Sequence, residues 1–244
     1  VVRLAVHPVS CYRRDERCPD PAAQAAEFVP MVIGIDDEVP ATTVARWAPA
    51  GARFLLGYNE PDWGNGHNHP HQCSPAAAAR DWPRVQALAD AVDPPLRLVS
   101  PAMSTTGVSD DGTSRWLDEF FGNCTVAPGC NTSRIEFVAF HDYGGNVASI
   151  ARRAAGMQER YSRQVWITEF AINSYACPRC IISRAASDVY LAAALPVLDA
   201  SDAVFRYAWF TSRGPDDPGV AVSNLLPSQT NSTTPTSTGR IYAS

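Results

Sequence analysis

The sequence of 244 residues lacks any run of about 18 or more apolar residues, so we expect no membrane-spanning helix. It also lacks a basic stripe. The formal net charge is −5 and the cationic side chains are scattered, which argues against a nucleic-acid partner. No charged, apolar and small-residue leader is seen at its start, so we expect any secretion signal to have been removed already. These absences exclude several classes of protein without identifying one.

The sequence also shows neither an internal repeat nor a linker between domains, which favours a single domain over residues 1–244. That length is typical of one α/β barrel. Hydrophobic residues make up 45% of the chain and charged residues 18%, so a large core can form. The segment Ser228–Thr238 is rich in Ser, Thr and Asn, and we expect it to be a flexible loop.

Short apolar segments alternate with longer segments of helical spacing. The apolar segments are nearly continuous, which is typical of strands buried on both faces of a parallel sheet. Strands are expected at Val2–His7, Phe28–Ile33, Arg53–Tyr58, Leu96–Ser100, Ile135–His141, Gln164–Thr168 and Val204–Phe210. Helices are expected at Val39–Trp47, Ala76–Val92, Thr113–Phe121, Val147–Tyr161 and Arg184–Ala200.

This alternation predicts βαβ units and therefore an α/β fold. A doubly wound sheet would usually carry a glycine-rich phosphate loop after its first strand, and residues 6–10 (Val-His-Pro-Val-Ser) are nothing of the kind. The sequence thus favours a single (β/α)8 TIM-type barrel. Only seven strands are visible, so one strand is either absent or too irregular to detect.

The seven cysteines indicate the compartment. Three close pairs, Cys11/Cys18, Cys124/Cys130 and Cys177/Cys180, can each staple a loop, which leaves Cys73 unmatched; other pairings stay open. Glycosylation acceptor sequences occur at Asn123, Asn131 and Asn231, and the first two lie beside Cys124 and Cys130. Their coincidence with loop cysteines predicts an extracellular, secreted protein with disulfides. The alternative is a cytosolic enzyme with free thiols.

Polar side chains end several of the expected strands, and in an α/β barrel the active site lies at those ends. One strand ends in Asn59 and Glu60, another in Glu169, a third in His141 and Tyr143. Two carboxyl groups can act as proton donor and nucleophile in glycosidic cleavage if their surroundings give them different protonation states. Aromatic rings offer flat faces to sugars.

Two segments resemble the signatures of glycoside hydrolase family 128. They are Phe54–Asp62, with the sequence Phe-Leu-Leu-Gly-Tyr-Asn-Glu-Pro-Asp, and Trp166–Ala171, with the sequence Trp-Ile-Thr-Glu-Phe-Ala. Supporting matches occur in the family's order at Phe28–Met31, Ser100–Ala102, Phe137–His141 and Tyr207–Phe210. Together they cover most of the chain.

The resemblance implies a (β/α)8 barrel that hydrolyses β-1,3-glucan with retention, as an endo-β-1,3-glucanase without metal or cofactor. Glu60, ending the fourth strand, would be the acid/base, and Glu169, ending the seventh, the nucleophile. Asn59 would hold the sugar 2-hydroxyl. The donor-side cleft would be lined by His141, Tyr143 and Trp209. The comparison locates the undetected strand near the amino terminus, where the barrel would be reduced or irregular, and we expect a monomer.

Two other hypotheses compete. One is a non-hydrolytic β-1,3-glucan-binding protein on the same fold, because Asp142 stands where the family usually has an aromatic residue and because the barrel looks incomplete. The other is a metal or redox protein. It would use His67, His69, His71 and Cys73, or the Cys177/Cys180 pair. The glycine, asparagine and proline of the histidine loop, and the lack of a thioredoxin-like pattern, favour loop roles instead.

Overall fold

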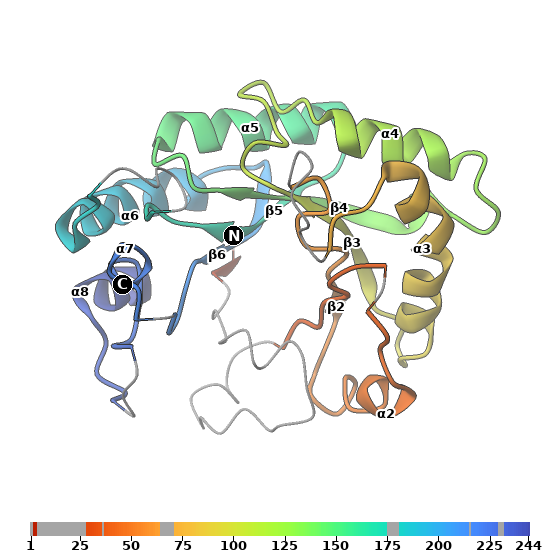
Figure 1. Ribbon diagram of the computed structural model, residues 1–244, viewed down its shortest axis with the longest axis horizontal. Coiled ribbons are helices and arrows are strands. Elements are labelled where there is room, and N and C mark those ends of the chain that lie inside the picture. The colour runs from red at the N-terminus through yellow and green to blue at the C-terminus, as the bar shows by residue number, and fades with distance from the viewer. Residues whose placement is uncertain are drawn as a thin grey trace.

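The computed structural model describes residues 2–3, 28–35, 37–63, 71–174, 181–214, 216–228 and 232–244. These residues form one parallel sheet whose strands run in the order β1-β6-β5-β4-β3-β2. The sheet is curled, and helices lie in an arc around its outer face (Figure 1). The architecture is α/β, as the alternating pattern predicts.

The strands agree with the predicted segments in position, although their ends differ. They are β1 (Val2–Arg3), β2 (Phe54–Leu55), β3 (Arg97–Met103), β4 (Ile135–Asp142), β5 (Val165–Phe170) and β6 (Val204–Trp209). β2 is much shorter than predicted, and residues 4–7 of the first predicted strand lie outside the described residues. Residues 28–33 are not a strand. They join β2 through a bridge between Met31 and Leu56 and through backbone hydrogen bonds, such as that from Val32 N to Leu56 O at 3.0 Å.

The described residues therefore do not form the closed eight-stranded barrel that the sequence predicts. They make an open, curled half-barrel with β1 at one edge and β2, extended by residues 28–33, near the other. Residues 4–27, near the amino terminus where the undetected strand is expected, lie outside the described residues. The expectation of a reduced or irregular amino-terminal part therefore stays a prediction.

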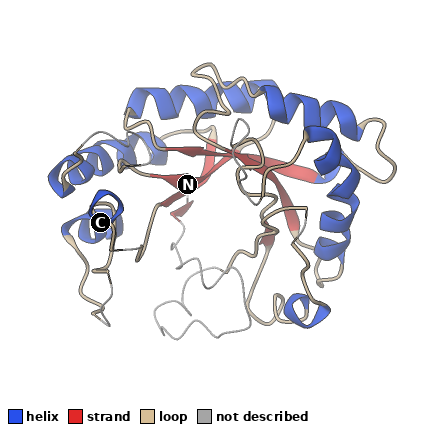
Figure 2. Ribbon diagram, viewed as in Figure 1, coloured by secondary structure: helices blue, strands red, loops and turns tan. Residues whose placement is uncertain are grey.

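The helices pack against the convex face of the sheet (Figure 2). They are α2 (Ala41–Val44), α3 (Pro75–Asp90), α4 (Arg115–Cys124), α5 (Val147–Tyr161), α6 (Arg184–Asp199), α7 (Pro218–Ala221) and α8 (Ser237–Ala243), with a 3-10 turn at Thr132–Arg134. α3 begins at Pro75, one residue before the predicted start at Ala76. Ser74 caps it, because its Oγ accepts a hydrogen bond from Ala77 N at 3.2 Å. The predicted loop Ser228–Thr238 already contains the start of α8, which Thr236 caps.

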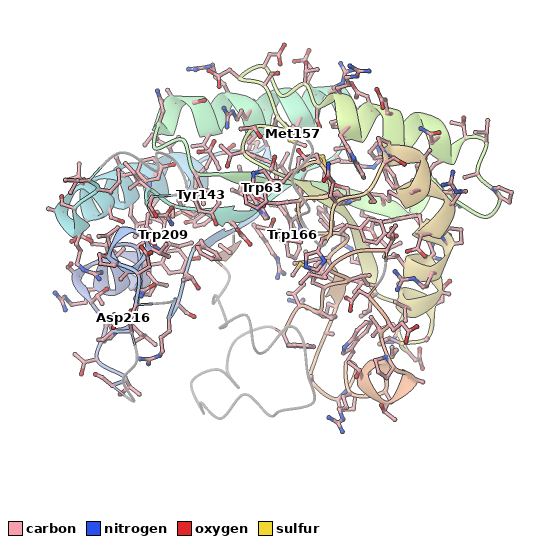
Figure 3. The ribbon with its side chains drawn as sticks, in the orientation of Figure 1. Trp63, Tyr143, Met157, Trp166, Trp209 and Asp216 are labelled. Atoms are coloured by element: carbon pink, nitrogen blue, oxygen red, sulfur yellow. A yellow bond between two sulfur atoms is a disulfide. The ribbon has the colours of Figure 1, made fainter. Side chains whose placement is uncertain are left out.

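The two faces of the sheet pack differently. The convex face and the helices share one continuous apolar cluster. The concave face carries a separate cluster in which Phe54, Phe137 and Trp166 contact one another edge-on, with ring centroids 5.1 to 5.9 Å apart. Trp166 of this cluster is labelled in Figure 3. Arg206 lies over Phe54 at 4.5 Å, a cation–π contact that accommodates a buried guanidinium. Strands buried on both faces explain the continuous apolar runs in the sequence.

Of the three predicted cysteine pairs, Cys124/Cys130 is confirmed as a disulfide with a Cα–Cα distance of 5.1 Å. The other two pairs lie outside the described residues, as does Asn231. The Asn131 side chain is exposed, although its Oδ1 accepts a hydrogen bond from Ser133 N. None of the described helices is long and apolar enough to span a bilayer.

Candidate active site

The predicted site residues meet at the carboxyl end of the sheet. Glu60 follows β2, His141 lies near the end of β4, and Glu169 lies in β5. His141 and Glu169 are register partners of neighbouring strands, so their side chains emerge at the same level. The chain separates Glu60 from Glu169 by more than a hundred residues, and the parallel order of the strands brings them together.

A chain of short contacts links these side chains. His141 Nδ1 lies 2.7 Å from Glu60 Oε1 and 3.4 Å from Glu169 Oε2. The Tyr143 hydroxyl donates a hydrogen bond of 2.6 Å to Glu169 Oε2. Oxygen atoms of Glu60 and Glu169 and a ring nitrogen of His141 all lie within 4.8 Å of one another. The two carboxyl groups thus face each other across a gap of a few ångströms.

The turn that carries Glu60 is held on both sides. Glu60 has φ of 46°, a left-handed conformation that is rare outside glycine, and its backbone N–H donates to Ala102 O at 2.9 Å. Two residues later, Asp62 accepts hydrogen bonds from the backbone N–H and the hydroxyl of Ser104, each 2.9 Å long. Strain of this kind persists only where the surroundings over-determine it, and it concentrates at functional sites.

Burial and charge set the protonation of the cluster. Side-chain exposure is 1% for His141, 16% for Glu60 and 25% for Glu169. Burial lowers the pKa of His141, but the charges of Glu169 and Glu60 outweigh it and raise the pKa to about 9. Burial raises the pKa of Glu169, the neighbouring Glu60 raises it further, and the His141 cation and the Tyr143 hydrogen bond oppose the rise.

The raised pKa of His141 predicts a pH-dependent stability. A group whose pKa is higher in the folded state stabilises it fully below the ordinary pKa of 6.5 and loses this contribution as the pH rises through about 9. We therefore expect the free energy of unfolding to fall over this interval. Chemical denaturation at a series of pH values measures it, with His141→Asn as the control. An equally steep fall in the control protein would contradict the assignment.

Among the described residues, Glu60, His141 and Glu169 form a donor set that could hold a metal ion by distance. A cation there would replace the proton between His141 and the carboxylates. The expectation that the protein needs no metal or cofactor stays a prediction. His67 and His69 of the histidine loop, and the Cys177/Cys180 pair, lie outside the described residues.

The other predicted binding residues differ in their surroundings. Asn59 is half-buried beside Glu60, and its backbone N–H donates to Ile33 O at 3.0 Å. Trp209 was expected to line the cleft, yet its side chain is fully buried. Its Nε1 donates to Ser223 O at 2.6 Å and its ring packs edge-on against Phe170. The ring supports the strand ends in this structure, and its contact with substrate stays a prediction.

Two residues that follow Glu60 were not among the predicted site residues. Asp62 is more often a residue that fixes a loop than one that touches substrate, and its bonds to Ser104 agree with the loop role, although that partner could not be read from spacing. Trp63 is half exposed three residues after Glu60, and its backbone N–H donates to Glu60 O at 3.1 Å (Figure 3). A tryptophan three residues after a strand-end glutamate is a signal that the sequence did offer.

A curled α/β sheet with two facing carboxyl groups at its strand ends is an arrangement that glycoside hydrolases use. A family model described as "Glycosyl hydrolase catalytic core" matches residues 12–242. The chain belongs to this glycosyl hydrolase catalytic core family and is a glycoside hydrolase.

Solved structures of glycoside hydrolase family 128 resemble the chain. A subgroup II endo-β-1,3-glucanase from Sorangium cellulosum is 29% identical, with a TM-score of 0.69, and the match covers 96% of this chain and 87% of that one. Another from Pseudomonas viridiflava is 30% identical, with a TM-score of 0.69 and coverage of 93% and 83%. A mutant subgroup I enzyme from Amycolatopsis mediterranei, in complex with laminaripentaose, is 28% identical, with a TM-score of 0.67 and coverage of 88% and 81%. The resemblance drawn from the two glutamate motifs is confirmed.

A curated relative is the alkali-sensitive linkage protein 1 of Schizosaccharomyces pombe. It is 28% identical over 201 residues, which cover 80% of this chain and 33% of the relative. The chain thus spans about a third of the length of that relative.

Proposed function

We propose that the protein is a retaining endo-β-1,3-glucanase in which Glu169 is the nucleophile and Glu60 the acid/base. The observation that carries this proposal is the gap between the two carboxyl groups, whose nearest recorded atoms lie within 4.8 Å. Retaining glycosidases have carboxyl groups roughly 5 Å apart, whereas inverting enzymes need a wider gap to admit a water molecule.

The contacts of each carboxyl group support the division of roles. A hydrogen bond from the Tyr143 hydroxyl to Glu169 favours the ionised form that a nucleophile needs. Glu60 has His141 Nδ1 at 2.7 Å, a neighbour that can exchange a proton with it. Two carboxyl groups this close do not ionise independently, and in this proposal Glu60 receives the proton needed for catalysis, with His141 beside it to exchange one.

The reaction then runs in two steps. The Glu169 carboxylate attacks the anomeric carbon while Glu60 gives its proton to the departing oxygen, so the glycosidic bond breaks as a glycosyl ester forms. Water then attacks the same carbon, Glu60 takes a proton from that water, and the ester bond breaks. The product keeps the β configuration, and both carboxyl groups return to their starting states.

The substrate class comes from the relatives. Structures of the family 128 enzyme from Amycolatopsis mediterranei and its mutants hold laminaripentaose, laminaritriose and laminarihexaose, which are β-1,3-linked. That enzyme is 28% identical to this chain. In the proposal Asn59 holds the sugar 2-hydroxyl, and His141, Tyr143 and Trp209 belong to the donor side. The protein works as a single (β/α)8 domain over residues 1–244, as a monomer, outside the cell. The Cys124–Cys130 disulfide supports the last point.

One of the two observations behind the binding-only alternative is weakened. Asp142 stands in place of a sugar platform, but its side chain is 1% exposed and pairs with Arg153 at 2.9 Å. The residue therefore turns away from the cleft, while both glutamates remain in place beside each other. The other observation, an incomplete barrel, agrees with the open half-barrel that the described residues form.

The proposal predicts how the protein treats polymers. Incubated with laminarin, it is expected to release oligosaccharides, with the β anomer appearing first in proton NMR spectra. A soluble β-1,4-glucan is expected to stay intact. First formation of the α anomer would rule out retention, and equal cleavage of the two polymers would rule out the β-1,3 preference.

Trp63 is expected to bind the leaving side of the substrate, because it follows the proposed proton donor and is half exposed. We expect Trp63→Ala to raise KM for laminari-oligosaccharides about tenfold, the size of a lost ring contact. Little change is expected for an aryl laminarioside, whose small leaving group does not reach the ring. Trp116, half-buried on α4, serves as the matched control in Trp116→Phe. A KM rise of the same size for both substrates would contradict this role.

A further inference from the structure

Asp142 carries a buried charge that the proposed reaction does not use. Its carboxylate is 1% exposed and accepts hydrogen bonds from two sources. Arg153 Nη1 on α5 donates to Oδ2 at 2.9 Å, and the backbone N–H of Gly144 donates to Oδ1 at 2.9 Å. A buried carboxylate is costly unless it is paired and hydrogen-bonded, so these bonds fix the side chain firmly.

The Arg153 side chain extends the contact to a second loop. It is 15% exposed and pairs with Asp110 at 3.2 Å, and its Nη1 lies 3.4 Å from Thr105 O. Thr105 Oγ1 in turn accepts a hydrogen bond of 3.0 Å from the backbone N–H of Tyr143. Asp142, Tyr143 and Gly144 are thus each held by a separate bond. We call the ion pair of Asp142 and Arg153, with Thr105, the Tyr143 clamp.

Tyr143 connects the clamp to the proposed nucleophile. Its hydroxyl donates to Glu169 Oε2 at 2.6 Å, and its ring packs edge-on against Phe210 at 5.9 Å. A hydrogen bond this short depends on where the phenol is held, because its strength falls steeply with distance and angle. The backbone on either side of Tyr143 is what the clamp fixes.

We infer that Asp142 and Arg153 are positioning residues, which hold the Tyr143 hydroxyl on Glu169 and so keep the nucleophile ionised at the working pH. This inference rests on the proposed function. Several other charged or titratable groups lie near Glu169 and near Asp142. Around Glu169 they are Glu60 and His141, with Asp62 beside His141; around Asp142 they are Asp110 of the 104–113 loop and Tyr190 of α6.

The test uses the acidic limb of the pH profile of kcat/KM, which reports ionisation of the nucleophile. Asp142→Asn is expected to move this limb upward by about half a pH unit or more, because Glu169 loses a well-placed hydrogen bond. The direction of the shift separates an effect through space from a displacement of Tyr143. Removing a negative charge acts through space to lower the pKa of Glu169, whereas a displaced Tyr143 raises it.

A double-mutant cycle separates positioning from a general structural effect. Tyr143→Phe is expected to move the limb upward as well, and Asp142→Asn is expected to add no further shift in that background. Arg153→Lys keeps the charge but not the forked geometry, and it gives a second reading if Asp142→Asn folds poorly. Arg160→Gln is the matched control, because it breaks the ion pair with Asp118 from the same helix.

An unmoved or lowered acidic limb in Asp142→Asn and Arg153→Lys, or an equal shift with and without the Tyr143 hydroxyl, overturns the inference. The proposed function fails separately, if Glu169→Gln retains activity on laminarin. If Glu169→Gln is inactive but the acidic limb of Asp142→Asn does not move, the inference about the clamp is wrong and the proposed function stands.

Discussion

Glu169→Gln is expected to lower kcat for laminarin hydrolysis on the order of 10⁴-fold, since removing one member of a catalytic unit has effects of this size. An amide cannot form the glycosyl ester, and it is nearly the same size as the carboxylate it replaces. Binding is therefore expected to persist, with calorimetry giving a similar Kd for laminari-oligosaccharides. The Tyr143 hydroxyl can still donate to the amide oxygen, so the site keeps its shape.

Glu159→Gln provides the matched control, because Glu159 lies exposed on α5. It is expected to hydrolyse laminarin at the wild-type rate. If Glu169→Gln stayed within tenfold of wild type, the assignment of the nucleophile would be wrong. If binding vanished together with turnover, the loss would reflect a damaged site and not missing chemistry.

Glu60→Ala is expected to lower the rate of laminarin hydrolysis about 10²- to 10⁴-fold, the usual contribution of a general acid. The loss is expected to be much smaller in the first step with a dinitrophenyl laminarioside, because this leaving group departs without a proton. Azide is expected to restore turnover and to give a β-glycosyl azide, since it needs no general base to attack the ester at Glu169.

His141 complicates this variant, because Glu60→Ala leaves the imidazole beside Glu169 alone, 3.4 Å away. Thermal unfolding of the variant checks that the fold persists. An equal loss on laminarin and on the activated substrate would contradict the role of Glu60 as proton donor. An azide product of α configuration would mean that azide displaces the leaving group directly, which would contradict attack by Glu169.

Much of the fold could be predicted because it depends on local pattern. The runs that became β4, β5 and β6 are apolar on both faces, and Val147–Tyr161 was predicted with its observed bounds. Weakly patterned segments were predicted less well. Residues 28–33 read as a strand but pair with β2 only at Met31 and by isolated hydrogen bonds, which depend on tertiary packing.

The candidate site was also predicted only in part. Strand ends identified Glu60 and Glu169, because parallel strands bring their carboxyl ends to one edge of the sheet. The direction of a side chain depends on distant partners and cannot be read from spacing. The buried Trp209 ring donates a hydrogen bond to Ser223 O. The Asp142 carboxylate forms an ion pair with Arg153 on the following helix.

The central claim is that Glu169 forms a bond to the sugar while Glu60 lies within reach across the gap. Covalent trapping tests this claim most directly. A 2-deoxy-2-fluoro laminarioside with a good leaving group slows both steps and lets the glycosyl-enzyme accumulate. After proteolysis, mass spectrometry is expected to find the added sugar on the peptide that contains Glu169, with none in Glu169→Gln. A label on Glu60, or full inactivation of the enzyme without any label, would contradict the account.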